Sequence, residues 1–420
     1  MHSFRFVHTA DIHLDSPLRG LAGHDGTAVE LIRGATREAL VALVTRTIEE
    51  ESSFLLIAGD LYDGDWRDYQ TGLFFVGQMG RLREAGIPVF LIYGNHDAKS
   101  QITRHLHLPK NVVQLPSRSA GTHLIEKLGV AIHGQSFRRP KVTENVALRY
   151  PEPRAGHFNI GLLHTSLSGA EGHEHYAPCT IDHLVAKGYD YWALGHVHDP
   201  AIRHEFPHIV YPGVLQGRHI RETGPKGAML VTVRDGTVAG VKPFQVDVVR
   251  WRVVDVPATD CHTIGDLENA MRRCIENEVS SQDDMRLLAC RVRITGRSEA
   301  HGVALASQEH LLAEARAAAE GLGEERAWIE RLVVATEPPT EAASFGALIE
   351  TLGDVSAASV DEDLLAQLGD DIGTFVAKLD ADLRRGPEDP LLRAAVHGEY
   401  GRLIELASPI ALAELRRGGD

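Results

Sequence analysis

Short apolar runs alternate with longer amphipathic stretches along the first half of the chain, and this pattern predicts strands that alternate with helices. The longer stretches, 29–48 and 73–82, repeat apolar residues at the spacing of one helix face. The short runs, which are typical of buried strands, are 4–8, 54–58, 87–93, 160–163 and 191–194. This order favours an α/β fold whose strands are buried on both faces.

Each short run ends at a cluster that contains histidine, aspartate or asparagine. In chain order the clusters are Asp11-Ile12-His13, Gly59-Asp60-Leu61-Tyr62-Asp63, Gly94-Asn95-His96-Asp97, Leu163-His164-Thr165 and Gly195-His196-Val197-His198. Because the carboxyl ends of neighbouring buried strands lie at one rim of a sheet, we expect these clusters to meet there. The pattern therefore predicts one polar site that is assembled from five distant segments.

The second half of the chain follows a different pattern. Residues 208–246 favour hairpins, because Asp235-Gly236 separates two strand-like runs. The next stretch has the order strand, helix, strand, helix, strand and ends before Pro338-Pro339, and helical spacing follows it. We therefore expect three parts, which are 1–246, 250–337 and 340–420.

Charge is distributed unevenly along the chain. Of 43 Lys and Arg and 58 Asp and Glu, residues 1–245 hold 25 of each kind, so the net charge of −15 arises wholly from residues 246–420. Histidine has the opposite distribution, with 19 of 23 before residue 246. This contrast favours a metal site in the first part and a solvated or partner-binding role for the rest. The acidic total argues against strong nucleic-acid binding by the chain alone, since phosphate contacts need clustered lysine and arginine.

Cysteine content and hydrophobicity bear on the compartment. The four cysteines, Cys179, Cys261, Cys274 and Cys290, do not make a disulfide framework in 420 residues. The sequence shows neither a secretory leader pattern nor an apolar run long enough to cross a bilayer. We therefore expect a cytoplasmic protein without a membrane partner.

The residue types in the five clusters suit divalent metal ions. Histidine, aspartate and asparagine without thiolates favour manganese, with ferrous iron, zinc and magnesium as alternatives, over calcium. Two such ions can bind the oxygens of a phosphodiester, activate water and stabilise the leaving oxygen. A carboxylate that bridges the ions offsets part of their charge. The clusters therefore predict a two-metal phosphoesterase site.

The same motifs resemble those of the calcineurin-like metallophosphoesterase superfamily and, within it, the SbcD-type DNA repair exonucleases. The stretches from His8 to Leu18 and from Gln216 to Glu222 are similar to the bacterial YhaO-like branch. The resemblance covers residues 1–245. It implies a four-layer αββα sandwich of the α/β (α+β) class, followed by a small mixed α/β cap domain and a helical C-terminal region.

The resemblance also implies a role for each matching residue. One ion would be held by Asp11, His13, Asp60 and His198, and the other by Asp60, Asn95, His164 and His196, with Asp60 as the bridge. His96 would stabilise the transition state and protonate the leaving oxygen. Asp97 would orient His96, although a cap of the following turn is an equal alternative for Asp97.

Two further positions bear on the substrate. Arg218 and His219 follow a loop and are expected near the substrate phosphate, although a loop arginine can equally be only solvated. Archaeal and eukaryotic counterparts of the repair nuclease usually have histidine where Asp63 stands, whereas bacterial members often have aspartate. This difference leaves metal binding untouched, but it weakens any DNA-handling role that is inferred from those counterparts.

Together these features predict a metal-dependent phosphodiesterase that hydrolyses DNA as an exonuclease or endonuclease. The resemblance implies an SMC-like or AAA-type ATPase subunit as a partner, and it leaves a homodimer open. Residues 340–420 are expected either to bind that partner or to pack on the cap domain. One alternative is a phosphoesterase for nucleotides or other small phosphoesters, because the superfamily shares the motifs. Another is a non-catalytic subunit of an ATPase complex, against which the presence of every expected ligand and of His96 argues.

Overall fold

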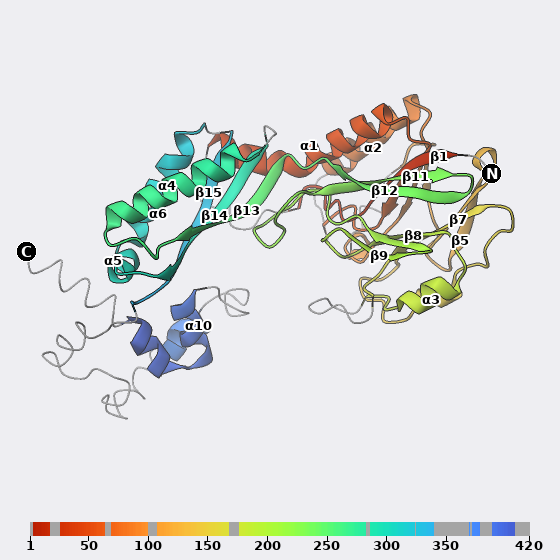
Figure 1. Ribbon diagram of the computed structural model, residues 1–420. Helices are drawn as coiled ribbons and strands as arrows, with labels where there is room; N and C mark the ends of the chain where they lie inside the picture. The colour runs from red at the N-terminus through yellow and green to blue at the C-terminus, as the bar shows by residue number, and fades with distance from the viewer. Residues whose placement is uncertain are drawn as a thin grey trace, which may run out of the picture. The chain divides into compact units, whose positions relative to one another are not determined.

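The computed structural model of the 420-residue chain divides into two compact units. The N-terminal unit comprises Met1–Arg252 and Arg286–Leu288, and the C-terminal unit comprises Val253–Met285 and Ala289–Asp420 (Figure 1). The residues that the structure describes are 3–16, 26–63, 69–99, 107–167, 176–282, 286–323, 325–339, 369, 372–378 and 389–407.

The first sheet of the N-terminal unit has six strands in the order β12-β11-β1-β2-β3-β4. They are β1 (Phe4–Thr9), β2 (Leu55–Ala58), β3 (Val89–Ile92), β4 (Val112–Gln114), β11 (Gly227–Arg234) and β12 (Thr237–Gln245). The strands β1 to β4 run parallel, with Val7 opposite Leu55 and Leu55 opposite Val89. The strands β11 and β12 form the hairpin predicted around Asp235-Gly236, and β11 pairs antiparallel with β1.

The second sheet has the order β5-β6-β7-β8-β10-β9. Its strands are β5 (Gly121–Ile125), β6 (Val130–Gly134), β7 (Phe158–His164), β8 (Tyr191–Gly195), β9 (Ala201–Glu205) and β10 (His208–Tyr211). The four central strands run parallel, and the edge strands β5 and β9 are antiparallel to their neighbours. Both sheets thus direct the carboxyl ends of their central strands to a rim.

A layer of apolar side chains joins the two sheets. Phe6 and Phe54 of the first sheet stack with ring centroids 4.9 Å apart, and Tyr191 of the second sheet meets Phe6 edge to face at 5.3 Å. These rings are buried together with Phe90 and Ile160. The strands are therefore covered on both faces, which explains why their sequences are apolar throughout rather than alternating.

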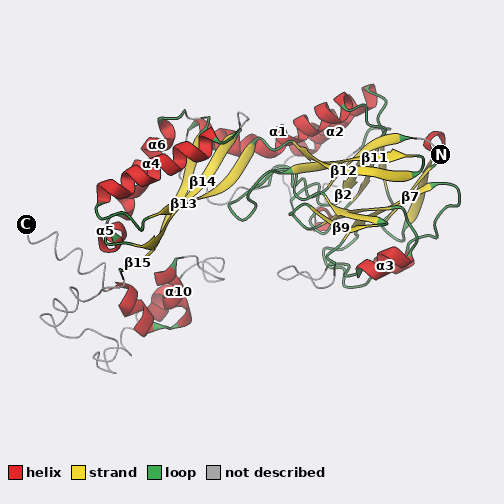
Figure 2. Ribbon diagram, viewed as in Figure 1, coloured by secondary structure: helices red, strands yellow, loops and turns green. Residues whose placement is uncertain are grey.

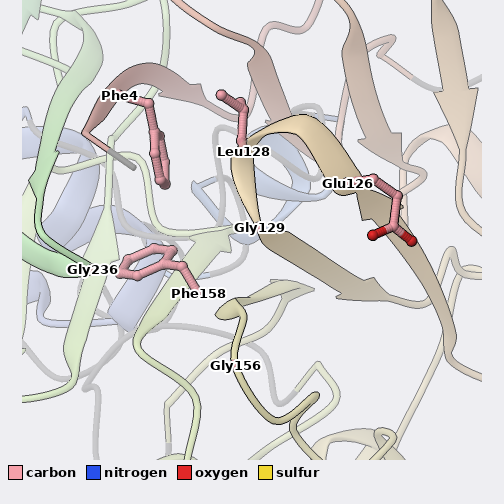
Figure 3. A pocket seen from close by; sticks show the side chains of 7 residues that line it. All are labelled: Phe4, Glu126, Leu128, Gly129, Gly156, Phe158 and Gly236. Atoms are coloured by element: carbon pink, nitrogen blue, oxygen red, sulfur yellow. The ribbon is translucent and has the colours of Figure 1, made fainter. Parts of the chain in front are cut away.

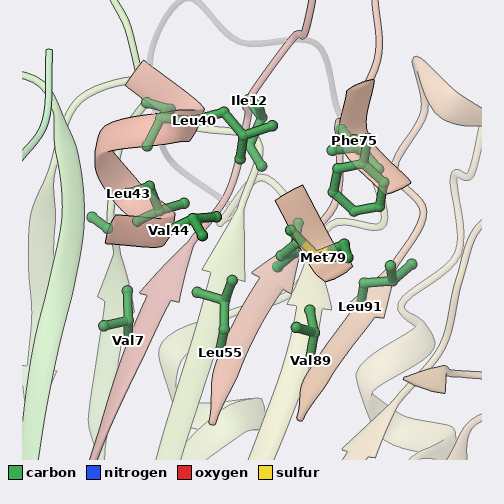
Figure 4. Packing of buried hydrophobic residues seen from close by; sticks show 14 of the residues in the cluster. Val7, Ile12, Leu40, Leu43, Val44, Leu55, Phe75, Met79, Val89 and Leu91 are labelled. Carbon is green, nitrogen blue, oxygen red and sulfur yellow. The ribbon is translucent and has the colours of Figure 1, made fainter. Parts of the chain in front are cut away.

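Helices cover the outer faces of both sheets. On the first sheet, α1 (Thr27–Glu49) and α2 (Tyr69–Glu84) pack residues such as Leu40 and Met79 against Val7, Leu55 and Leu91 (Figure 4). On the second sheet, α3 (Ile181–Ala186) and the short helix η4 (Val146–Arg149) cover the cluster around the buried Trp192. The other short helices are η1 (Asp97–Lys99) and η3 (Glu126–Leu128). The predicted four-layer αββα sandwich is confirmed.

The C-terminal unit contains a three-stranded sheet in the order β13-β14-β15. Its elements are β13 (Val249–Pro257), α4 (Ile264–Ser280), β14 (Leu287–Arg297), α5 (His301–Ala306), α6 (Gln308–Glu320) and β15 (Ala327–Glu337). The strands run parallel, as the bonds from Ala258 N to Thr295 O at 2.8 Å and from Ser298 N to Glu337 O at 3.0 Å indicate. The helices lie against one face of the sheet (Figure 2). The predicted small α/β domain is therefore present, with two helices where one was expected after β14.

Local sequence signals account for where several helices begin and end. Thr263 and Asp266 form a capping box at the start of α4, in which each side chain accepts a bond from the other residue's backbone N–H. The helix α10 (Pro390–His397) has Asp389 as its N-cap, proline at its first position and Gly398 in the left-handed conformation at its end. Helix α10 agrees with the helical spacing expected after residue 340, and residues 340–368 lie outside the described ranges.

Two further features of the described residues concern surfaces. None of the helices in the described ranges is long and apolar enough to span a membrane. A pocket of about 240 Å³ lies at the rim where β1 and β7 begin, opposite their carboxyl ends (Figure 3). It is lined by Phe4, Glu126, Leu128, Gly129, Gly156, Phe158 and Gly236.

Candidate metal centre

The predicted ligands lie at the carboxyl ends of five strands in two sheets. From the first sheet, Asp11 and His13 follow β1, Asp60 follows β2 and Asn95 follows β3. From the second sheet, His164 ends β7, and His196 and His198 follow β8. Six of them lie in two groups of facing donor atoms, which are Asp11, His13 and His198, and Asp60, His164 and His196. A third group joins His13 to Asp63 and His96.

The backbone at these strand ends adopts conformations that are uncommon for residues other than glycine. Positive φ angles occur at Asp11 (49°), His13 (45°), Asp60 (51°) and His196 (100°). Backbone bonds hold two of them, from Asp11 N to Gly59 O and from His13 N to Asp60 O, both at 3.0 Å. Such conformations cluster at functional sites, where the surrounding structure enforces them. Here they turn the side chains off the strand ends and into the rim.

The first group combines two imidazoles with a carboxylate. Nε2 of His13 lies 3.3 Å from Nε2 of His198, which lies 3.9 Å from Oδ1 of Asp11. The side chains of Asp11 and His13 are 0% and 1% exposed. Asp11 accepts two bonds from the backbone N–H of His196. A buried carboxylate that faces two imidazole nitrogens is a donor set that suits a divalent ion.

The second group centres on Asp60. Its Oδ2 lies 3.4 Å from Nε2 of His164 and 4.0 Å from Nε2 of His13, which belongs to the first group. One carboxylate oxygen therefore faces both groups, as a bridging ligand must. Asn95 contributes Oδ1 at 3.0 Å from Nε2 of His164. His196 completes the group, with its donor atom within 4.8 Å of those of Asp60 and His164.

Hydrogen bonds behind two imidazoles fix which nitrogen faces the centre. Nδ1 of His164 lies 2.9 Å from Ala58 O and thus donates to it. Nδ1 of His198 lies 2.7 Å from Oε1 of Glu222 and donates to that carboxylate. In both rings Nε2 is left to offer its lone pair toward the centre, which is the arrangement typical of metal-ligating histidine. The residues present therefore fit a two-metal centre.

Electrostatics within the second group indicate that metal and proton compete. Burial lowers the pKa of His164, but the carboxylates of Asp60 and Asp11 raise it to about 9. Burial raises the pKa of Asp60, yet His164 and its neighbours hold it well below its usual range. Without an ion, His164 thus carries the positive charge that stabilises the buried carboxylate. Metal binding would displace that proton.

The carboxylate of Asp97, which was expected either to orient His96 or to cap the following turn, bonds to backbone N–H groups of two preceding loops. Its carboxylate accepts bonds from the backbone N–H groups of Leu61 (3.2 Å), Tyr62 (2.9 Å) and Gly94 (2.9 Å) and so ties the loop after β2 to the loop after β3. The carboxylate beside His96 is instead that of Asp63, whose Oδ1 lies 2.7 Å from Nδ1 of His96.

The loop after β10 adds Arg218, His219 and Glu222. The side chain of Arg218 is 13% exposed, and its NH1 lies 3.7 Å from Oδ2 of Asp63, beside the centre. That of His219 is 50% exposed, with Nε2 3.7 Å from Glu222. Burial raises the pKa of Glu222, but bonds from His198 and Arg218 hold it well below its usual range. Glu222 was not predicted as a site residue, because it follows no strand end.

Comparisons with known proteins agree with this geometry. Residues 4–200 match the family model of the calcineurin-like phosphoesterases. This match includes the positions of all seven predicted ligands. Residues 251–337 match a second model, the middle domain of metallophosphoesterase YhaO. A curated relative, the uncharacterized metallophosphoesterase YhaO of Bacillus subtilis (strain 168), is 38% identical over 259 residues. That match covers 61% of this chain and 63% of the relative, less than two thirds of its length.

Two solved structures are similar at low sequence identity. TT1561 of Thermus thermophilus is 12% identical with a TM-score of 0.34, and covers 58% of this chain and 100% of its own. A dimetal phosphatase from Danio rerio is 11% identical with a TM-score of 0.35, and covers 55% of this chain and 93% of its own.

Proposed function

We propose that this protein is a two-metal phosphodiesterase that hydrolyses DNA, with manganese as its preferred ion. The observation that carries the proposal is the position of Asp60, whose Oδ2 faces His164 of one group at 3.4 Å and His13 of the other at 4.0 Å. A buried carboxylate between two sets of imidazoles serves to hold two cations close together.

Each of the two ligand groups would hold one ion. Asp11, His13 and His198 would hold one ion, Asn95, His164 and His196 the other, and Asp60 would bridge them. When bound, two divalent cations supply the Lewis acidity that draws charge from a phosphodiester and activates water. Manganese is favoured over calcium, because four imidazoles contribute to the donor set.

His96 lies beside the metal ligands without belonging to their two groups. Its backbone N–H donates to Oδ1 of Asp60 at 2.9 Å, and its side chain is 33% exposed, so that a substrate can reach it. Because Asp63 holds Nδ1, the ring presents Nε2 for the transfer of a proton to the leaving oxygen. His96 is thus the proposed general acid, with Asp63 in the orienting role.

The choice of DNA rests on the resemblance to SbcD-type nucleases and on the presence of a second unit after the catalytic one. The acidic second half, with 33 of the 58 acidic residues, argues that a partner supplies part of the charge that binds DNA. We therefore propose an SMC-like or AAA-type ATPase subunit as that partner.

Hydrolysis of labelled linear and circular DNA by the full chain tests the proposal, beside a small phosphodiester such as bis(p-nitrophenyl) phosphate. Each substrate is incubated with Mn²⁺ and with chelator, and Asp60→Asn serves as the matched inactive variant. Mn²⁺-dependent cleavage of DNA that is absent in Asp60→Asn supports the nuclease. Turnover of the small diester with intact DNA favours small phosphoesters instead. Inactivity on both by a folded, metal-loaded chain contradicts the phosphodiesterase and favours a non-catalytic subunit.

A further inference from the structure

The loop that carries Arg218 and Glu222 is anchored rigidly within the N-terminal unit. The side chain of Gln216 is buried and donates to Val249 O at 2.6 Å, while its own oxygen accepts from Val248 N at 2.9 Å. The indole of Trp251 donates to Gly217 O at 3.0 Å. These bonds fix both the start of the loop and the strand beside it, so the side chains that come next are held in place.

Glu222 acts on a metal ligand from behind. Its side chain is 5% exposed, and Oε1 accepts from Nδ1 of His198 at 2.7 Å. The other oxygen, Oε2, accepts the backbone N–H of Arg218 at 2.8 Å. A carboxylate in this position fixes the ring of a ligating histidine and increases its basicity.

Asp63 acts on the proposed general acid in the same way. Its Oδ1 lies 2.7 Å from Nδ1 of His96, and its Oδ2 accepts from Oγ of Ser16 at 2.5 Å. The side chain is 21% exposed. Two carboxylates from distant loops thus stand behind two histidines of one centre.

The guanidinium of Arg218 lies between these two carboxylates. NH2 donates to Oε1 of Glu222 at 2.9 Å, Nε lies 3.4 Å from Oε2, and NH1 lies 3.7 Å from Oδ2 of Asp63. NH1 also lies 3.5 Å from Oγ of Ser16. Each nitrogen of the guanidinium is therefore engaged within the protein, and its charge is shared by two anions.

We propose that Arg218 is a positioning residue which holds Glu222 and Asp63, and through them the rings of His198 and His96, rather than a ligand of the substrate phosphate. The inference rests on the proposed function, because that function makes His198 a metal ligand and His96 the general acid. It joins the metal centre to the leaving-group histidine through one Glu222–Arg218–Asp63 bridge.

Removal of Arg218 leaves two carboxylates close together without the cation between them. Repulsion between Glu222 and Asp63 then pushes the two carboxylates apart, so that the rings of His198 and His96 lose their fixed orientation. Lysine keeps the charge, but it lacks the planar fork that engages Glu222 through two nitrogens. The loss should therefore appear in metal affinity and in kcat, and not in KM.

The test compares wild type with Arg218→Ala, Arg218→Lys and Glu222→Gln in the full chain. Calorimetric titration with Mn²⁺ alone gives the affinity, hydrolysis of a phosphodiester gives kcat and KM, and thermal unfolding verifies that each variant is folded. Arg221→Ala is the matched control, because Arg221 belongs to the same loop and is exposed. We expect Mn²⁺ affinity to fall about 10–100-fold in Glu222→Gln and Arg218→Ala. Arg218→Lys should lie between these variants and the unchanged control.

The outcomes separate the two roles of Arg218 and also separate this inference from the proposed function. A rise in KM for Arg218→Ala, with Mn²⁺ affinity and kcat unchanged, would overturn the positioning role and identify a phosphate ligand. Unchanged Mn²⁺ affinity in Glu222→Gln while wild type remains active would overturn it as well. A wild type that binds Mn²⁺ tightly but hydrolyses no phosphodiester refutes the proposed activity. In that case the Mn²⁺ affinities of the variants still show whether Arg218 and Glu222 position His198.

Discussion

The two units are built on the same plan and differ in the residues at the carboxyl ends of their strands. Both contain parallel strands connected by helices, as in β1-α1-β2 and β13-α4-β14. In the N-terminal unit the strands lead directly into buried histidine and aspartate, several of them with positive φ. In the C-terminal unit they end at Pro257, Arg297 and Glu337, and the three ligand groups found among the described residues all lie outside that unit. The chemistry therefore resides in the residues after the strands rather than in the fold.

The two units also differ in whether their charged side chains are buried or exposed. Asp11 and Asp60 are 0% and 2% exposed, and burial of such charges is costly unless cations compensate them. In the second unit's sheet, Arg293 pairs with Asp255 at the surface, where their side chains are 48% and 54% exposed. The buried carboxylates of the first unit lower stability but form a reactive site. The exposed pair of the second unit contributes little to stability.

Loss of the proposed general acid should give the largest effect on catalysis that leaves the metals in place. His96→Ala should lower kcat by about 10²–10⁴-fold while Mn²⁺ binding persists, because neither the group that contains Asp11 nor the group that contains Asp60 includes His96. Asp63→Asn should cost less, since the ring remains but loses its charged partner. Paired kinetics and Mn²⁺ titration measure both, and unaltered turnover in His96→Ala would exclude the assigned role.

Glycines beside the ligands are closely packed, whereas a glycine on the exposed side of a helix is not, and substitution by alanine should separate the two cases. Gly59 has φ of 93°, and a Cβ there would lie 2.5 Å from Nδ1 of His164, so Gly59→Ala should lower stability by more than about 1 kcal/mol and weaken metal binding. Gly77 lies in α2 with open space around it, so Gly77→Ala should raise stability by about 0.5–1 kcal/mol. Denaturant unfolding gives the free energy of unfolding of both variants. Equal changes in the two variants would refute the contrast.

The smallest effect is expected from the surface pairs of the C-terminal unit. Arg293→Ala should change the free energy of unfolding by less than about 1 kcal/mol, because exposed ion pairs contribute little. Hydrolysis should be unaffected. A clear loss of activity in a folded Arg293→Ala protein would mean that the sheet face takes part in function.

Much of the fold was predictable, because its central strands are strongly apolar. The runs at 54–58 and 191–194 become β2 and β8, and the helical spacing at 29–48 becomes α1. The strands β4, β5, β6 and β9 were not predicted. Of these, β4, β5 and β9 lie at sheet edges, where their partly exposed side chains give no clear apolar run, whereas β6 is buried but short.

The site was predictable only as far as the strand ends indicate it. The clusters converge as expected, and their binding of metal ions remains a prediction. Asp97 directly follows His96, whereas Asp63 belongs to the motif after β2, and sequence spacing could not show which carboxylate meets the ring. Glu222 comes from an irregular loop, so only its contact with His198 reveals it.

The most direct test of the central claim is the number of Mn²⁺ ions that each chain binds. Calorimetric titration of the metal-free protein, verified by elemental analysis, should give two ions per chain. Asp60→Ala should lose both, because Asp60 faces both ligand groups. A single ion per wild-type chain, or two ions retained in a folded Asp60→Ala variant, would contradict a centre that is bridged by Asp60.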